Sequence, residues 1–101
     1  MKKTVAIFGG DKESTYKQLG KKNGCDVLFH NGKARNGGTV KAFQPLVNKA
    51  DFCIVLLGSI GHISQDLIKE LGKELGKPVI FQPGKGVSAA LRKGLELVEA
   101  V

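Results

Sequence analysis

The two histidines are the residues of this chain whose chemistry is most open to a functional role. His30 and His62 each follow an apolar run, directly or within a few residues, and each has a glycine within two positions. Neutral imidazole can accept a proton, donate one hydrogen bond or bind a metal ion. A single histidine is usually structural, but two at matching places in the chain indicate a shared ligand site.

Metal and hydrolytic chemistry have weaker support from the other reactive residues. A mononuclear metal site needs a third ligand, and the same group of loops offers only Asp11. Ser59 and Ser88 could act as nucleophiles beside a histidine, but no acidic residue follows to complete a triad. Cys25 and Cys53 lack the C-x-x-C spacing of zinc and redox sites. We therefore expect binding rather than catalysis, and the residues identify no cofactor.

The charge and the apolar runs limit the class of partner. A formal net charge of +7 permits anionic ligands, nucleic acid included, but the lysines are spread along the chain. There is no Trp and one Tyr, so a base-stacking surface for single strands is poorly supplied. No apolar run approaches the roughly 20 residues of a membrane span, and the first run ends at Phe8, too early for a signal peptide. We expect a cytoplasmic protein that does not bind a membrane.

Four short apolar runs, rich in Val and Ile, are typical of strands that are covered on both faces of a parallel sheet. They are 4–8, 26–29, 52–57 and 78–81. Helical spacing and end signals predict helices between and after them, at about 12–19, 45–49, 62–75 and 88–99. Asp11 and Ser88 are candidate N-caps, Gly20 and Gly76 are candidate stops, and Pro45 suits a first helical turn.

This alternation of strands and helices predicts an α/β fold. We expect a single small three-layer α/β/α domain over residues 1–101, with a four-stranded parallel sheet in the order 2-1-3-4. Folds of this Rossmann-like or flavodoxin-like kind bind ligands outside the carboxyl ends of the strands.

The loops that leave the strands contain both histidines and most of the glycines, whereas the loops that enter strands are short and lysine-bearing. Glycine lets the backbone approach a ligand closely, and helix N-termini at this edge favour anions. The predicted ligand-binding residues are Gly9, Gly10, Asp11, Lys12, His30, Gly32, Lys33, Arg35, Ser59, Gly61, His62, Gly84, Lys85, Gly86 and Ser88.

The loop after the second strand, from His30 to about Gln44, is the longest and has no acidic residue. It is either a basic lid over an anion or an ordinary surface loop. Neither G-x-G-x-x-G nor G-x-x-x-x-G-K-[ST] is present, so no nucleotide fingerprint is found. Cys25 and Cys53 fall near the amino ends of strands about 10 Å apart, too far for a disulfide.

Several short motifs, spread over nearly the whole chain, have a recognisable order and spacing. They are Gly9-Gly10, FHNG at 29–32, KADFCIVL at 49–56, His62, GKPVIF at 76–81 and G-x-G-x-S at 84–88. In these the chain resembles a bacterial family called domain of unknown function 2325. The resemblance implies the same fold and the same loop edge, but no established activity. Family members often have Cys-x-Ser-His where this chain has SIGH at 59–62, which implies that thiol chemistry is lost here.

The leading hypothesis is a small cytoplasmic domain that binds an anionic ligand at the carboxyl ends of the strands. That ligand would be a nucleotide, a phosphorylated metabolite or a nucleic-acid phosphate. Two alternatives stay open. One is a metal- or redox-linked sensor that uses His30 and His62. The other is a homodimeric interaction module with no small ligand, since sheet edges and helix faces often pair with a second copy.

Overall fold

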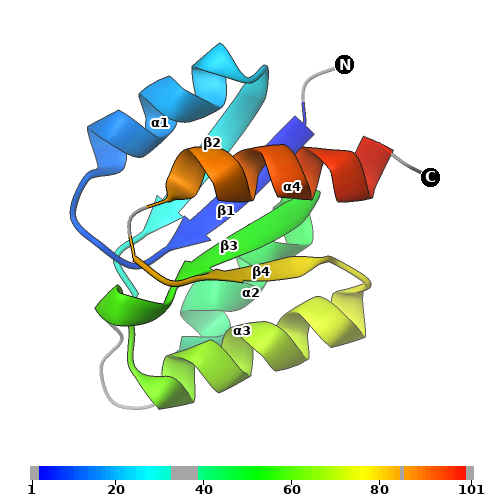
Figure 1. The fold of residues 1–101 in the computed structure, drawn as a ribbon. Coiled ribbons are helices and arrows are strands. Elements are labelled where there is room, and N and C mark those ends of the chain that lie inside the picture. Colours follow the sequence, from blue (N-terminus) through cyan, green and yellow to red (C-terminus); the bar gives the residue numbers. More distant parts are fainter. Residues whose placement is uncertain (1–2, 33–38, 85, 100–101) are drawn as a thin grey trace.

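The computed structural model describes residues 3–32, 39–84 and 86–99 (Figure 1). Its strands are β1 (Lys3–Phe8), β2 (Cys25–His30), β3 (Phe52–Leu56) and β4 (Val79–Gln82). Its helices are α1 (Glu13–Lys22), α2 (Thr39–Lys49), α3 (His62–Leu75) and α4 (Val87–Glu99), with a short 3-10 helix η1 (Leu57–Ser59) after β3. All four strands lie within one residue of the predicted bounds at each end.

The strands form one parallel sheet in the order β2-β1-β3-β4, which confirms the predicted topology. Figure 1 shows α1 and α4 over one face of the sheet and α2 and α3 over the other. The end strands β2 and β4 flank the central pair, β1 and β3, and the helices cover both faces of that pair. The described residues include no helix that is long and apolar enough to cross a membrane.

The apolar runs are buried because each face of the sheet receives alternate side chains. In β1, Val5 and Ile7 pack toward α1 and α4, whereas Ala6 and Phe8 pack toward α2 and α3. All four are completely buried. The strands therefore supply two cores, and a continuous apolar run is what a sheet covered on both faces requires.

Two helices begin and end close to the predicted residues. Helix α3 runs from His62 to Leu75 as predicted, and Gly76 ends it in the left-handed conformation at φ 68°. There the Lys77 N–H donates to the Gly72 carbonyl at 2.7 Å, which satisfies one of the last free carbonyls. Helix α4 begins at Val87, one residue before the prediction.

Helix α1 begins within one residue of the prediction, but its predicted N-cap and its predicted C-terminal end were wrong. The residue before the helix is Lys12 rather than Asp11, and no side chain caps it there. Gly20 lies inside the helix, which continues to Lys22, because it is a contact point and not a stop. A Cβ at Gly20 would lie 2.3 Å from Cγ2 of Val27, so glycine lets α1 approach β2 closely.

The predicted start of α2 at Pro45 was also wrong, since the helix begins at Thr39 and holds the proline in its interior. An interior proline costs about 3 kcal/mol. The same helix buries Phe43 and Val47 completely, and each such side chain contributes roughly 1.5–3 kcal/mol. Apolar packing therefore offsets the lost hydrogen bond. The loop predicted from His30 to Gln44 is shorter as a result, and its residues 33–38 lie outside the described part of the chain.

Candidate functional site

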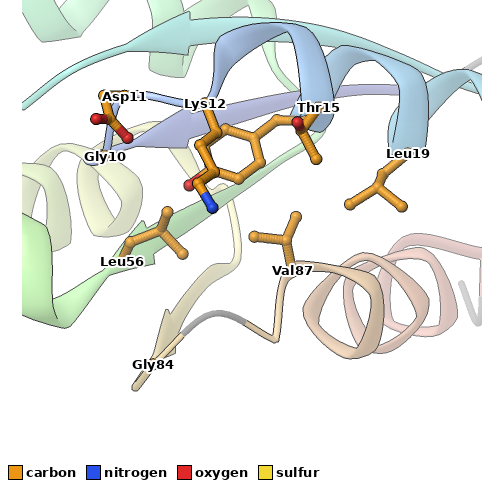
Figure 2. Close-up of a pocket in the computed structure, with 9 residues that line it drawn as sticks. Gly10, Asp11, Lys12, Thr15, Leu19, Leu56, Gly84 and Val87 are labelled. Atoms are coloured by element: carbon orange, nitrogen blue, oxygen red, sulfur yellow. The ribbon is translucent and has the colours of Figure 1, made fainter.

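A pocket of about 390 Å³ opens at the carboxyl edge of the sheet, between the beginnings of α1 and α4 (Figure 2). Its walls come from the turn after β1, the first turns of α1, the end of β3 and the start of α4. The residues that line it are Gly10, Asp11, Lys12, Thr15, Tyr16, Leu19, Leu56, Gly84 and Val87.

The pocket lies where the direction of the strand connections reverses. From β1 the chain leads through α1 on one face to β2, and from β3 it leads through α3 on the other face to β4. Since β1 and β3 are neighbours, a crevice opens between their carboxyl ends. Gly10 follows β1 and Leu56 ends β3, and both line the pocket. This is the position at which open α/β sheets usually bind their ligands.

Two helix N-termini meet at the pocket. The Tyr16 N–H donates to the Lys12 carbonyl at 3.0 Å in α1, and the Ala90 N–H donates to the Gly86 carbonyl at 3.2 Å in α4. The N–H groups of residues 13–15 and 87–89 therefore have no acceptor within their own helices. Free N–H groups and the helix dipoles make this side of the pocket favourable for negative charge.

Among the described residues, one cation and one carboxylate border the pocket. Lys12 and Asp11 are both exposed, and in Figure 2 the Lys12 side chain extends toward the space that Leu56 and Val87 border. Asp11 lies beside Gly10 at the far end of the pocket from Leu19 in the same view. The pocket thus has a charged end and an apolar end.

The Tyr16 side chain contributes a hydroxyl group to this pocket. Its ring packs against Phe29, with ring centroids 5.8 Å apart, and only 8% of the residue is exposed. Its hydroxyl lies against Gly10, where an added Cβ would be 2.7 Å from the oxygen. Gly10 also has φ 86°, so both its conformation and its close contact require glycine.

The Tyr16 hydroxyl has no hydrogen-bond partner among the described residues. No completely buried side-chain oxygen in the same part of the chain lacks a partner, so this hydroxyl must reach the space of the pocket. Burial raises the pKa of Tyr16, and the nearby Asp11 carboxylate raises it further. The hydroxyl therefore keeps its proton at neutral pH and is a hydrogen-bond donor.

His30 lies on the opposite face of the sheet. Its ring makes an edge contact with Phe43 at a centroid distance of 4.9 Å and lies 6.3 Å from Phe8. Its Nδ1 accepts a hydrogen bond of 2.9 Å from the Gly32 N–H, so the proton of the neutral ring is on Nε2. Burial lowers the pKa of His30, which favours this neutral form. These contacts give His30 a structural role, which is to hold the turn after β2.

The structure brings only part of the predicted site together. Gly10, Asp11, Lys12 and Gly84 line the pocket, and Gly9 is buried just before them. Gly61 and His62 are exposed at the start of α3, while Gly86 and Ser88 flank the first residue of α4. Lys33, Arg35 and Lys85 lie outside the described residues, and the side chain of Ser59 is not described.

Neither histidine lines the pocket, and no described contact joins His30 to His62. The described residues include no group of three or more His, Cys, Asp or Glu side chains that could hold a metal ion. Cys25 and Cys53 are both buried near the amino ends of β2 and β3, at the other edge of the sheet, and no disulfide joins them.

The sequence reasoning missed five lining residues, Thr15, Tyr16, Leu19, Leu56 and Val87. A signal for three of them was present. Thr15, Tyr16 and Leu19 lie three, four and seven positions after Lys12, which is the spacing of one helix face. Leu56 and Val87 gave no such signal, because apolar residues at these places are expected in the core.

The sequence profile of a family described as an uncharacterized protein conserved in bacteria, domain of unknown function 2325, matches residues 4–98. The chain belongs to the family of domain of unknown function 2325. The match covers every strand except the first residue of β1, and it includes every residue that lines the pocket.

Relatives of the chain are similar to it over nearly their whole length. A UPF0751 protein of Bacillus cereus strain AH820 is 38% identical over 97 residues, which is 96% of this chain and 97% of the relative. A UPF0751 protein of Desulfitobacterium hafniense strain Y51 is 30% identical over 92 residues, with 88% and 89% of the two chains covered. No solved structure gives a significant match.

Proposed function

We propose that this protein binds a small phosphorylated ligand in the pocket between α1 and α4. The observation that carries the proposal is the meeting of two helix N-termini and the Lys12 side chain at one pocket of about 390 Å³. Pockets for small ligands are usually about 300–1,000 Å³ and contain a few convergent polar groups. The position at the strand-order reversal supports the same function.

Charge supports an anion over a neutral ligand. The chain has a formal net charge of +7, and the free N–H groups at the two helix N-termini beside the pocket carry partial positive charge. Phosphate accepts several hydrogen bonds at once, so it suits a site with free N–H groups, one ammonium and one phenolic hydroxyl. We also propose a cytoplasmic location, where phosphorylated metabolites and nucleotides are made and used.

Thermal unfolding in the presence of inorganic phosphate, sugar phosphates and nucleotides tests the proposal. A ligand at 100 times its dissociation constant stabilises the folded state by about 2.7 kcal/mol. For a domain of this size that raises the midpoint by about 10 °C or more. If no phosphorylated compound raises the midpoint, the proposal is wrong.

A pair of lysine substitutions on α1 locates the site. Lys12→Ala removes the cation that lines the pocket, and Lys22→Ala removes an equally exposed lysine in the last turn of the same helix. Both variants change the net charge equally. We expect Lys12→Ala to weaken ligand binding about tenfold, since a hydrogen bond to a charged group contributes about 1.5–3 kcal/mol. Lys22→Ala should bind as the native chain does, and equal losses in both variants would argue against this pocket.

A further inference from the structure

The two ends of the pocket differ in chemistry, and that difference restricts the ligand. Given the proposed function, on which this inference rests, we infer that the ligand is a nucleoside monophosphate. Its phosphate would bind at the end formed by Lys12 and the Tyr16 hydroxyl. Its base would lie at the apolar end between Leu19 and Val87.

The apolar end is formed by side chains from two helices. Leu19 comes from the second turn of α1, and Val87 is the first residue of α4. In Figure 2 Leu19 lies at the end of the pocket away from Asp11, and Val87 lies between Leu19 and the Lys12 nitrogen, with Thr15 above them. A ligand that fills this end with a flat apolar ring buries apolar surface against Leu19 and Val87. Inorganic phosphate and sugar phosphates would leave it empty.

The charged end holds a donor that has no partner among the residues that the structure describes. Only 8% of the Tyr16 surface is exposed. Its hydroxyl nevertheless has no partner among the described residues and must open into the pocket. A ligand acceptor that takes this hydrogen bond in place of water adds affinity. The first-turn N–H groups of α1 and Lys12 are at the same end, which makes a phosphate oxygen the acceptor that fits.

Asp11 restricts the number of phosphate groups. Its carboxylate lines the pocket beside Gly10, next to the charged end. A second or third phosphate group would place further negative charge close to this carboxylate, and like charges at short range oppose binding. The volume of about 390 Å³ is near the lower limit for ligand pockets, which also favours one nucleotide over a dinucleotide.

Calorimetric titration of the full chain with four probes tests the inference. The probes are inorganic phosphate, ribose 5-phosphate, AMP and ATP, with CMP, GMP and UMP added to find the preferred base. We expect a nucleoside monophosphate to bind at least ten times more tightly than ribose 5-phosphate, and ATP to bind less tightly than AMP. Equal affinity for ribose 5-phosphate and every monophosphate would overturn the inference, while the proposed function would stand. If no probe binds, both are wrong.

Two variants separate the ends of the pocket. Tyr16→Phe removes only the hydroxyl, so it should weaken phosphate, ribose 5-phosphate and AMP by a similar factor of about three to ten. Thr15→Tyr adds a ring beside Leu19 at an exposed position, so it should weaken AMP at least tenfold and leave inorganic phosphate within twofold. Ser14→Tyr, one position earlier and outside the pocket, is the matched control and should change neither affinity.

The pattern of losses decides the inference. A Tyr16→Phe variant that binds every probe as the native chain does would show that the hydroxyl is not a ligand donor. A Thr15→Tyr variant that weakens phosphate and AMP equally, or neither, would show that the base does not lie at the Leu19 end. Asp11→Asn should raise ATP affinity relative to AMP, and an unchanged ratio would refute the argument from charge repulsion.

Discussion

Replacing Gly94 by alanine tests how closely α4 packs on the sheet. Gly94 lies in the middle of α4 and is buried, and the helix passes over β3 at this point. A Cβ at Gly94 would lie 2.1, 2.3 and 2.7 Å from three ring atoms of Phe52. Contacts this short are not compatible with either side chain in its present place.

Two opposing free energies decide the result. Alanine is favoured over glycine inside a helix by about 1 kcal/mol. Overpacking a well-packed core costs about 1–3 kcal/mol, and the upper value applies here because the Phe52 ring is completely buried and in contact at three atoms. The difference predicts a loss of about 2 kcal/mol in the free energy of unfolding. That corresponds to a midpoint about 8–16 °C lower for a domain of this size.

Chemical and thermal unfolding of Gly94→Ala measure this loss. Ala89→Gly, at an exposed position of the same helix, measures the propensity term alone and should cost about 1 kcal/mol. In a Phe52→Leu background the ring is gone, so Gly94→Ala should become neutral or stabilising. If Gly94→Ala is as stable as the native chain or more stable, the close approach of α4 to β3 is not as described.

Three further predictions concern other residues. Burial lowers the folded-state pKa of His30, so its contribution to the free energy of unfolding should be fully present above pH 6.5 and should be lost as the pH falls through the lowered pKa. His30→Gln should flatten this dependence in acid-unfolding curves. Burial raises the pKa of the Cys53 thiol to about 12, so a thiol reagent at pH 8 should modify Cys53 only as fast as the protein unfolds, and faster labelling would contradict its burial. The Asp51 carboxylate accepts the Thr4 N–H at 2.8 Å, so Asp51→Ala should cost about 1–3 kcal/mol in urea unfolding while Asp51→Asn, which keeps an acceptor, should cost less.

Most of the fold could be predicted because the strands are buried on both faces. A continuous apolar run such as that of β3 has few other interpretations in a chain of 101 residues, and the crossover rules then limit the strand order. The helix ends were harder to predict. Glycine commonly ends a helix, so Gly20 was predicted to be a stop. In the structure its lack of a side chain allows close packing on Val27, and only the tertiary contact reveals this.

The sequence could predict the edge of the sheet that holds the site, but not the face. Gly10 and Lys12 were found because they follow β1 directly. Tyr16 was not found, because a tyrosine within an amphipathic helix is ordinarily a core residue, and its ring is indeed packed in the core. Its functional interest rests on one oxygen atom that has no partner in the described part of the chain, and composition and spacing contain no signal for that.

The alternation of side chains along a strand explains why His30 is separated from the pocket. Phe8 and His30 are partners in the register of β1 and β2, so both side chains point toward α2 and α3. Leu56 points to the other face, toward α1 and α4, where the pocket is. Two residues can therefore share the carboxyl edge and still lie on opposite sides of the sheet. It follows that substitutions of His30 should act on the stability of the turn after β2, whereas substitutions of Lys12 should act on ligand binding.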